Sequence, residues 1–238
     1  MKSSFKKLLN FILNFAGFEI QKKSPSLIFT IAGINYNVDK CSVGRTNEGE
    51  PTALGAIKMI RERGLKDLRI LDVGCGAGII GMTIFSHLQE IITKMGFVDI
   101  NIFNINSLKR TLEINNLSED KRIHYWLSDV LKFIPEEEKF DIIISNPPHF
   151  FTKKFNEMTP RNLGAYDKDW LFHKDFYANC HKYLTDRGEV WFLENGGAAS
   201  PVDLMPFIIN NPRLRYVSTI NEPLLNNTFF WMITKNNI

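Results

Sequence analysis

The stretch LDVGCGAGIIG occupies residues Leu71–Gly81 of the chain. It follows the apolar run 68–73, which predicts a buried strand, and it leads into a helical pattern over 79–93. The loop between them carries three alternating glycines, Gly74, Gly76 and Gly78. Alternating glycines let the backbone turn tightly and approach a ligand closely, and the first turn of the next helix offers free N–H groups. The stretch therefore predicts a strand–loop–helix unit that wraps a bound group.

Strand and helix patterns alternate along the chain outward from this loop. Six further strands are expected at residues 95–99, 122–127, 139–145, 188–194, 213–220 and 228–234. Further helices are expected at residues 104–116, 168–184 and 201–209. Strands separated by helices predict the α/β class, with a seven-stranded, doubly wound, mostly parallel sheet. Ligands of such sheets bind beyond the carboxyl ends of the strands, so the chemistry is expected just after residues 73, 99, 127 and 145.

The segment before this alternating region has a different pattern. Residues 5–18 place apolar side chains at helical spacing between lysines and asparagines, which predicts an amphipathic helix. Residues 27–38 alternate around Gly33-Ile34-Asn35 and predict a hairpin, and residues 52–63 predict a helix. Three parts are expected: an N-terminal amphipathic helix (1–24), a hairpin with a substrate-side helix or lid (25–65), and the main domain (66–238).

The amphipathic helix has two interpretations. It either packs on the domain, where it can cover the site, or makes a weak contact with a membrane surface or a partner. The net charge of +3 arises in this part, because residues 1–23 contain five lysines and one glutamate. The rest of the chain is close to neutral, so a nucleic-acid partner is less expected than a small molecule, since phosphate contacts favour a basic surface.

Bulk composition indicates a globular chain, with 44% hydrophobic and 23% charged residues. No apolar run reaches the roughly 20 residues that span a bilayer, and the N-terminus lacks the features of a signal peptide. The three cysteines are far apart, at Cys41, Cys75 and Cys180. Their odd number favours a reducing compartment and a cytoplasmic location, and no metal-ligand spacing occurs, so no metal is expected.

Acidic residues follow the first three strands of the main domain. Asp72 lies in the strand end before the glycines, Asp99 ends the second strand about 18 residues after Gly81, and Asp129 follows the third. A carboxylate at the end of the second strand can accept hydrogen bonds from both hydroxyls of a ribose. The loop also contains GxGxxG at residues 76–81, a pattern that fits a dinucleotide equally well. A nicotinamide-dependent oxidoreductase therefore stays open on the glycines alone.

The fourth strand runs into Asn146-Pro147-Pro148-His149-Phe150. Two consecutive prolines fix the local backbone and remove two N–H donors. The groups that remain, an asparagine side chain and proline carbonyls, can accept hydrogen bonds. Such acceptors suit a planar amino or amide nitrogen, whose N–H groups they hold while its lone pair faces a methyl donor.

The string DVGCGAG resembles motif I of class I S-adenosylmethionine-dependent methyltransferases. The resemblance implies a Rossmann-like fold, S-adenosylmethionine as cofactor and S-adenosylhomocysteine as product. The cofactor contacts that it implies are Asp72, Gly74, Cys75, Gly76 and Gly78 in the loop, then Asp99, Ile100, Ser128, Asp129 and Asn146. In such enzymes the loop wraps the methionyl part, the second acid binds the ribose and the third contacts the adenine.

The segment Asn-Pro-Pro-aromatic resembles the motif of amino- and amide-nitrogen methyltransferases, and the HemK-like release-factor glutamine methyltransferases are the group it is most similar to. The likeness covers roughly residues 28–195 and implies Asn146, Pro147 and His149 as catalytic residues. His149 departs from the family, in which Tyr or Phe stacks on the substrate. A histidine there can stack or act as a general base. The residues before the main domain are too few for the helical domain that precedes the fold in that group together with the hairpin, so a protein substrate is less expected.

Substrate contacts are expected from Glu48 and Glu50, in a loop that faces the cofactor mouth in similar enzymes, and from Phe150 and Trp170. The sequence thus favours an N-methyltransferase of a small molecule, moving a methyl group to an amino, amide or similar nitrogen. The alternative is a methyltransferase of a macromolecule, acting on a protein glutamine or on adenine or guanine of RNA or DNA. A module that binds cofactor without turnover is a third hypothesis.

Overall fold

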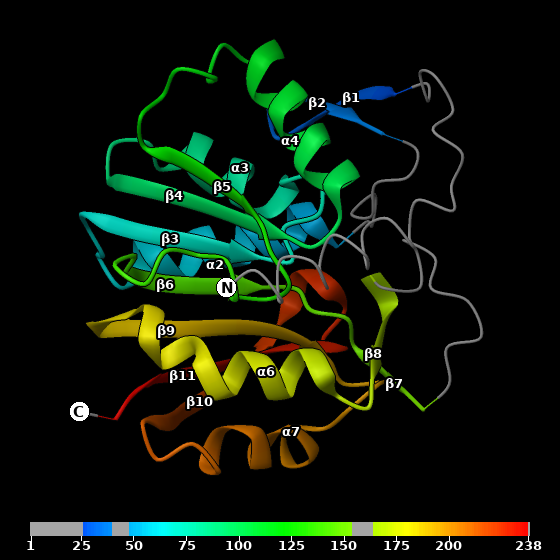
Figure 1. Cartoon of the computed structure of the whole chain (residues 1–238), viewed down its shortest axis with the longest axis vertical. Helices are drawn as coiled ribbons and strands as arrows, with labels where there is room; N and C mark the ends of the chain where they lie inside the picture. Colours follow the sequence, from blue (N-terminus) through cyan, green and yellow to red (C-terminus); the bar gives the residue numbers. More distant parts are fainter. Residues whose placement is uncertain (1–25, 40–47, 154–163, 238) are drawn as a thin grey trace, which may run out of the picture.

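The computed structural model describes residues 26–39, 48–153 and 164–237, and a seven-stranded sheet forms its centre (Figure 1). The strand order across the sheet is β10-β11-β9-β6-β3-β4-β5. The strands are β3 (Leu68–Val73), β4 (Ile92–Asp99), β5 (Ile123–Leu127), β6 (Phe140–Ser145), β9 (Leu184–Asn195), β10 (Leu214–Glu222) and β11 (Phe229–Asn236). The five strands from β9 to β5 in this order are parallel, and β11 pairs antiparallel with both β9 and β10. The predicted fold class is therefore confirmed.

The register of the sheet brings its functional loops to one edge. Val73 at the end of β3 is paired with Val98 of β4 on one side and with Ser145 of β6 on the other. Strand β4 then ends at Asp99, which is paired with Leu127, the last residue of β5. Because the strands are parallel, the loops after residues 73, 99, 127 and 145 all start side by side at the carboxyl ends.

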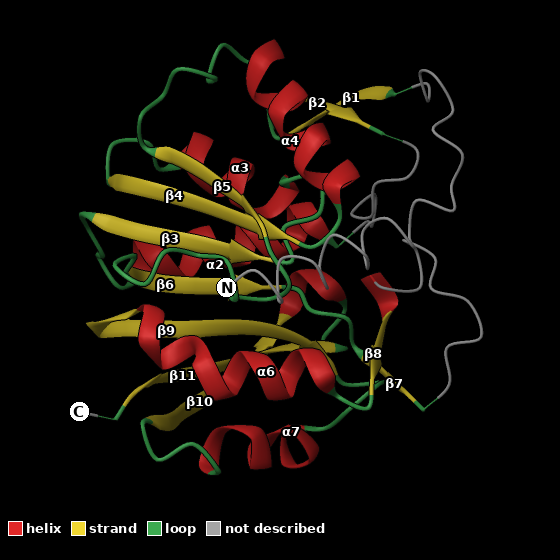
Figure 2. Ribbon diagram, viewed as in Figure 1, coloured by secondary structure: helices red, strands yellow, loops and turns green. Residues whose placement is uncertain are grey.

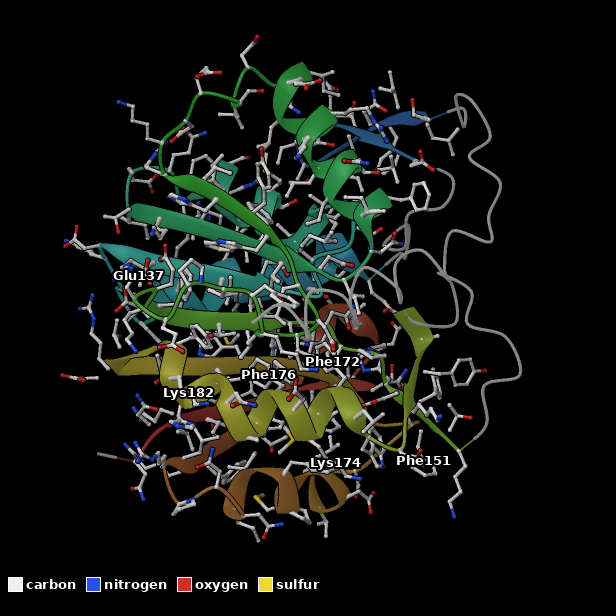
Figure 3. All side chains as sticks on the ribbon, viewed as in Figure 1. Glu137, Phe151, Phe172, Lys174, Phe176 and Lys182 are labelled. Atoms are coloured by element: carbon white, nitrogen blue, oxygen red, sulfur yellow. The ribbon has the colours of Figure 1, made fainter. Side chains whose placement is uncertain are left out.

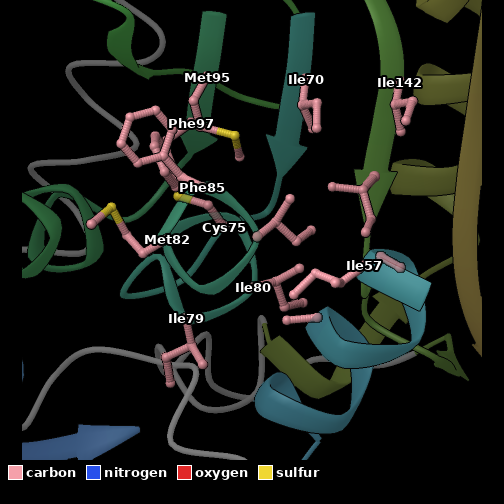
Figure 4. Close-up of a cluster of buried hydrophobic side chains, with 14 of the residues drawn as sticks. Ile57, Ile70, Cys75, Ile79, Ile80, Met82, Phe85, Met95, Phe97 and Ile142 are labelled. Carbon is pink, nitrogen blue, oxygen red and sulfur yellow. The ribbon is translucent and has the colours of Figure 1, made fainter. Parts of the chain in front are cut away.

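Helices cover both faces of the sheet (Figure 2). Helices α2 (Gly49–Glu62), α3 (Ile79–His87) and α4 (Ile102–Ile114) cover one face, and their apolar side chains share a core with the sheet. Figure 4 shows part of this core, in which Ile57 of α2 and Ile80 of α3 lie near Ile70, Phe97 and Ile142 of the strands. Burying this apolar surface on both faces stabilises the fold and leaves the loops at the sheet edge free for binding.

Helices α6 (Leu171–Asn179) and α7 (Pro201–Ile209) cover the opposite face with a second core cluster. Phe172 and Phe176 of α6 stack with their ring centroids 6.4 Å apart, and Phe176 lies 4.2 Å from Phe192 of β9 (Figure 3). This aromatic packing fixes α6 against β9, which matters for the site because α6 contributes a buried histidine described below.

Element boundaries differ from the sequence prediction at two helices. The helix expected at 79–93 ends at His87, because a turn leads into β4, which begins at Ile92. The helix expected at 168–184 begins only at Leu171 and ends in the 3-10 turn Cys180–Tyr183. The reason for its late start is a short parallel pair that the sequence did not predict, β7 (Phe150–Thr152) and β8 (Tyr166–Lys168).

The predicted hairpin is confirmed as β1 (Leu27–Ile31) and β2 (Ile34–Val38). Its turn is Ala32-Gly33, one residue earlier than expected, with φ of +49° and +80°. Two positive φ angles match the turn that suits the right-handed twist of a two-residue hairpin. The amphipathic helix predicted at 5–18 lies outside the described residues, so the three-part division of the chain stays a prediction.

The hairpin is fastened to α4 by side chains of the helix. The backbone N–H groups of alternate residues Asn35, Asn37 and Asp39 donate to side-chain oxygens of Asn115, Thr111 and Ser107, at 3.1, 3.1 and 3.0 Å. Asn115, which caps the end of α4, also donates from its amide to the carbonyl of Asn35. The hairpin thus lies on the helix that follows β4.

Candidate active site

The glycine loop leaves β3 by crossing towards β4. The N–H groups of Gly74 and Cys75 both donate to the carbonyl of Val98, at 2.8 and 3.0 Å. Gly74, Gly76 and Gly78 have φ of +67°, +56° and +83°, a region that residues with a side chain rarely adopt. A Cβ on Gly78 would lie 2.7 Å from Leu108, whereas a Cβ on Gly74 would meet nothing within 4 Å. Gly74 thus lies beside open space, as a ligand-binding loop requires.

Asp72 is fully buried behind this loop. Its Oδ2 accepts the N–H of Gly81 at 2.9 Å, which satisfies one of the free donors at the start of α3. Its Oδ1 is buried and has no hydrogen-bond partner. Burial raises the pKa of Asp72 to about 7, and the nearby carboxylate of Asp99 adds to the rise. A buried carboxylate oxygen without a partner is costly, so Asp72 is suited to a donor from a ligand.

Asp99 has a similar environment at the end of β4. Its Oδ2 accepts the N–H of Gly76 at 2.8 Å, and its Oδ1 accepts the N–H of Asn101 at 2.7 Å. Burial raises its pKa to about 6 although these hydrogen bonds lower it. The side chain of Asn104 and the backbone N–H of Ile100 also donate to this carboxylate, so a ribose hydroxyl would share or replace one of these donors. Ile100, which follows, is half-buried.

Among the residues that the structure describes, no lysine, arginine or histidine pairs with Asp72 or Asp99. The neighbouring thiol of Cys75 does not supply a charge, because burial and the two carboxylates raise its pKa well above the usual range. Two buried acids without a cation favour a ligand that carries positive charge.

The turn after β5 contains the next pair of predicted contacts. Ser128 is buried, donates its N–H to the carbonyl of Asp99 at 2.9 Å, and accepts the N–H of Phe133 on its Oγ. Asp129 is partly exposed and pairs with Lys132 at 2.5 Å. The carboxylate of Asp129 therefore already has a partner within the protein, which the sequence prediction did not include.

The asparagine after β6 is oriented by contacts on two sides. Ser145 donates its Oγ–H to the carbonyl of Val73 at 2.7 Å, which ties the ends of β6 and β3 together. The Nδ2 of Asn146 donates to Oε2 of Glu48 at 3.3 Å. The Oδ1 of Asn146 is buried and has no hydrogen-bond partner among the described residues. Because Glu48 engages the amide nitrogen, the carbonyl oxygen of Asn146 is the group left to accept a hydrogen bond.

Glu48 and Glu50 thus have different environments. Glu48 lies at the N-terminus of α2 and contacts Asn146 across a separation of 98 residues. Glu50 lies in the first turn of the same helix, where a carboxylate also stabilises the helix N-terminus. Pro147 is buried and Pro148 half-buried, so the segment is held firmly after Asn146.

His149 is buried, with 7% of its surface exposed, and leads into a chain of buried polar groups. Its Nδ1 lies 3.5 Å from Oε2 of Glu194, and its ring meets Phe229 edge to face at 5.5 Å. Glu194 Oε1 lies 3.1 Å from Nε2 of His173, and His173 Nδ1 lies 2.6 Å from Oδ2 of Asp167. The structure therefore joins β8, α6 and β9 to the segment after β6.

The charged side chains in this chain of buried polar groups compensate one another. Burial alone would lower the pKa of His173, but the carboxylates of Glu194 and Asp167 outweigh it and raise the pKa to about 9. Burial alone would raise the pKa of Glu194, but His173 and His149 lower it below its usual value. His173 is thus an imidazolium between two carboxylates. Sequence reasoning missed Asp167 and Glu194; the available signal was a glutamate at the end of the apolar run VWFLEN.

Exposed aromatic rings lie at the surface beside this chain of buried polar groups. Phe150 and Tyr166, on β7 and β8, are 42% and 44% exposed, and their ring centroids lie 5.9 Å apart. Phe151 (Figure 3) is also 42% exposed. Its ring centroid lies 5.6 Å from that of Trp170. Trp170 in turn meets His173 edge to face at 5.0 Å. Two predicted substrate residues, Phe150 and Trp170, therefore lie on the same short strand pair and its flank.

Comparison with known families decides the class of this protein. Residues 56–205 match the family described as methyltransferase small domain, which is more than half of the chain. The chain belongs to the methyltransferase small domain family. Its methyl donor is S-adenosylmethionine, and S-adenosylhomocysteine is the product.

Several curated proteins are similar to this methyltransferase chain. A tRNA1(Val) (adenine(37)-N6)-methyltransferase of Vibrio campbellii is 30% identical over 125 residues, which is 52% of this chain and 50% of that protein. A ribosomal RNA small subunit methyltransferase C of Hahella chejuensis is 31% identical over 177 residues, 74% of this chain and 42% of that protein. A release factor glutamine methyltransferase of Clostridium botulinum is 33% identical over 118 residues, 49% of this chain and 40% of that protein. The chain thus spans about half of these relatives or less.

Solved structures share the fold at low identity. The 16S rRNA N2 methyltransferase RsmC of T. thermophilus, in complex with AdoMet and guanosine, has a TM-score of 0.59 at 16% identity and covers 90% of this chain and 50% of that chain. Trm5b of Pyrococcus abyssi has a TM-score of 0.62 at 14% identity, with 91% of this chain and 57% of that chain covered. These likenesses establish the class I methyltransferase architecture.

The site fits the methyl donor of the family. S-adenosylmethionine carries a sulfonium and an ammonium group, and its ribose has two hydroxyls. The partnerless Oδ1 of Asp72, the carboxylate of Asp99 and the open space at Gly74 match these groups in charge and hydrogen bonding. Within the described part of the chain, no helix is both long and apolar enough to cross a membrane.

Proposed function

We propose that this protein is an N-methyltransferase that methylates the exocyclic amino group of a base in RNA, with adenine as the first candidate. One observation carries the proposal: Asn146 presents a buried Oδ1 without a partner while Glu48 holds its Nδ2. A carbonyl oxygen fixed in this way accepts an N–H of a planar amino group. That nitrogen leaves the plane of the base as it reacts, and its lone pair can then face the methyl donor.

The donor half of the site has the following proposed roles. Asp72 and the loop residues Gly74, Cys75, Gly76 and Gly78 surround the methionyl part of the cofactor. Asp99 accepts the ribose hydroxyls with Ile100 beside it, and Ser128 and Asp129 lie at the adenine. S-adenosylmethionine supplies a methyl group on a sulfonium, so its leaving group is already activated. The protein therefore contributes mainly position and orientation.

The acceptor half has a positioning role as well. Asn146 accepts one N–H, and Pro147 and Pro148 carry no N–H of their own that could compete for the nitrogen lone pair. The tie between Ser145 and Val73 keeps this segment next to the glycine loop, at 2.7 Å between Oγ and the carbonyl. Donor and acceptor loops are therefore held at the same sheet edge, which lowers the entropic part of the barrier.

A macromolecular acceptor is supported better than the small molecule that the sequence favoured. The curated relatives above are named for tRNA, ribosomal RNA and release-factor substrates. The exposed rings of Phe150, Phe151 and Tyr166 add a feature typical of RNA recognition, since unpaired bases stack on such rings. Lys168 at the end of β8 and Lys153 directly after β7 are both exposed and suit a phosphate backbone. RNA is therefore preferred over a protein glutamine.

The test is methyl transfer from tritium-labelled S-adenosylmethionine. Purified protein is given unmodified tRNA, unmodified ribosomal RNA, release factors or a set of small amines, and the products are digested and identified. The proposal expects N6-methyladenosine in one of the RNA samples. Label found only in N5-methylglutamine of a release factor, or only in a small amine, would overturn the RNA assignment while keeping the methyltransferase assignment.

Variants of one asparagine test the site itself. Asn146→Ala removes the fixed acceptor and is expected to lower kcat about 100-fold, in line with the loss of a positioning contact. The matched control is Asn237→Ala, whose amide donates to the carbonyl of Pro212 far from the site and which should keep full activity. Wild-type turnover by Asn146→Ala contradicts the proposed nitrogen site.

A further inference from the structure

The segment after Asn146 contains a second polar group without a partner. Both ring nitrogens of His149 are buried and make no hydrogen bond within the part of the chain that the structure describes. Nδ1 lies 3.5 Å from Oε2 of Glu194, an ion-pair distance that is slightly longer than an ordinary hydrogen bond. The ion-pair contact of this ring in the described part of the structure is at Nδ1 and not at Nε2. The two nitrogens of this ring therefore have different environments.

Glu194 is held from its other side. Its Oε1 lies 3.1 Å from His173 Nε2, so only Oε2 faces His149. His173 is fixed in turn by Asp167, whose Oδ2 lies 2.6 Å from Nδ1. Asp167 also accepts the backbone N–H groups of Phe172 and His173 at the start of α6, at 2.9 and 3.1 Å. Asp167 is thus oriented by His173 and two backbone N–H groups, and Glu194 is oriented by its contact with His173.

Charge in this chain favours one tautomer of His149. In the buried group Asp167–His173–Glu194, two carboxylates surround one imidazolium, so one negative charge is left over. Oε2 of Glu194 presents this charge to Nδ1 of His149. A negative oxygen next to one ring nitrogen stabilises a proton on that nitrogen, and the other nitrogen then becomes an acceptor. Because the ring of His149 packs edge to face on Phe229, it cannot easily turn over and exchange the positions of its two nitrogens.

We infer that Glu194 and His173 are positioning residues for His149, holding the proton of its neutral ring on Nδ1 so that Nε2 accepts a hydrogen bond from the methyl acceptor. His149 thereby accepts a hydrogen bond from a donor group of the methylated substrate, in addition to the N–H that Asn146 accepts. The identity of that acceptor rests on the proposed function, whereas the state of His149 does not. The chain Asp167–His173–Glu194 acts only through His149.

The direct test is the protonation pattern of the histidine ring in solution. Two-bond 1H–15N correlation spectra of the labelled full-length protein distinguish a proton on Nδ1 from a proton on Nε2, and His149→Gln assigns the signals. The expected pattern at pH 8 is a proton on Nδ1. In Glu194→Gln this preference should be lost. A proton on Nε2 in the wild type, or an unchanged pattern in Glu194→Gln, would overturn the inference.

Glu189→Gln is the matched control for the spectra. Glu189 lies in the same strand, but it pairs with Arg63 and Lys235 and contacts no histidine. The spectrum of His149 should be unchanged in this variant. Because the wild-type pattern alone can contradict the inference, the test does not depend on whether Glu194→Gln folds.

Kinetics supply the second readout. His149→Phe keeps a flat ring but removes Nε2, and it should lower kcat for the RNA acceptor about 10- to 100-fold with the Kd of S-adenosylmethionine unchanged within twofold. His149→Gln, which keeps an acceptor group, should recover part of this loss. Glu194→Gln should add little to His149→Phe, because both act through one contact. Wild-type kcat in His149→Phe would contradict the inference, whereas the absence of RNA methylation in the wild type itself would contradict only the proposed function.

Discussion

The donor half and the acceptor half of the site both bury carboxylates, but they compensate the charge differently. Asp72 is held by a backbone N–H group and Asp99 by backbone N–H groups and the side chain of Asn104, and burial raises their pKa values to about 7 and about 6. Asp167 and Glu194 share His173, whose pKa is raised to about 9 although burial alone would lower it. One of the two negative charges in the acceptor half is therefore compensated within the protein, whereas the donor half gains a positive charge only from its ligand. This difference suggests that one half is fixed in advance and the other is completed by binding.

The largest effect on stability is expected from replacing His173, the buried cation between Asp167 and Glu194. His173→Phe leaves two buried carboxylates unpaired and should lower the free energy of unfolding by about 3–5 kcal/mol at pH 6, or roughly 10 °C in Tm. Adding Asp167→Asn and Glu194→Gln should restore much of the loss. The measurement is urea unfolding at several pH values, with His181→Phe as the control. A loss that the neutral amides do not restore would mean that packing, and not charge, is the cause.

The same histidine predicts a pH dependence. Because its pKa in the folded protein is about 9, above the usual 6.5, its contribution is fully present below about pH 6.5 and is lost as the pH rises through about 9. The gap in stability between wild type and His173→Phe should therefore narrow between pH 7 and pH 10. A constant gap would contradict the charged state of His173.

The donor half should respond to neutralisation in the opposite direction. The raised pKa of Asp72 means that the folded state favours the protonated form, so its ionisation lowers stability as the pH rises from about 4 through about 7. Asp72→Asn keeps an acceptor for Gly81 and should raise the free energy of unfolding by about 1–3 kcal/mol at pH 8, with less gain at pH 5. Binding of S-adenosylmethionine should weaken. Asp186→Asn, exposed in β9, is the control, and a destabilised Asp72→Asn would refute the prediction.

Ligand binding should be linked to the same protons. Since a positively charged ligand favours ionised carboxylates, the affinity for S-adenosylmethionine should rise about 10-fold between pH 5 and pH 7, with release of protons on binding. Calorimetry in two buffers of different ionisation enthalpy measures this release. The slope should be smaller in Asp72→Asn. Equal affinity at both pH values would contradict the proposal that the donor half gains its positive charge from the ligand.

The smallest effect on stability is expected from the glycine loop. Gly74→Ala places a side chain at φ +67° with free space around it, so only the backbone strain of about 1 kcal/mol should appear. Gly64, at φ +60° and equally open, is remote from the site, which makes Gly64→Ala a matched control. Both variants should lose similar stability, but only Gly74→Ala should weaken cofactor binding. Equal cofactor affinity in the two variants would place the ligand elsewhere.

The fold and the donor half could be predicted because their signals are local. Asp72, Asp99 and Asn146 each stand at or next to the end of an apolar strand, and parallel strands bring such ends together. The contacts of the acceptor half depend on distant parts of the chain. Glu48 reaches Asn146 across 98 residues, and Glu194 meets His173 only because α6 packs on β9. The three-residue strands β7 and β8 are too short to give a periodic pattern.

The contact between the hairpin and α4 has a consequence for the behaviour of the chain in solution. Ser107, Thr111 and Asn115 repeat every four residues, about 6 Å along a helix, and the N–H groups they accept repeat every two residues of β2, about 6.6–6.8 Å along a strand. The helix therefore takes the place of a neighbouring strand along the outer edge of β2. An open strand edge is a template for pairing with other chains and for aggregation. This polar row on α4 closes that edge, so β2 does not offer its outer edge for pairing with a second chain.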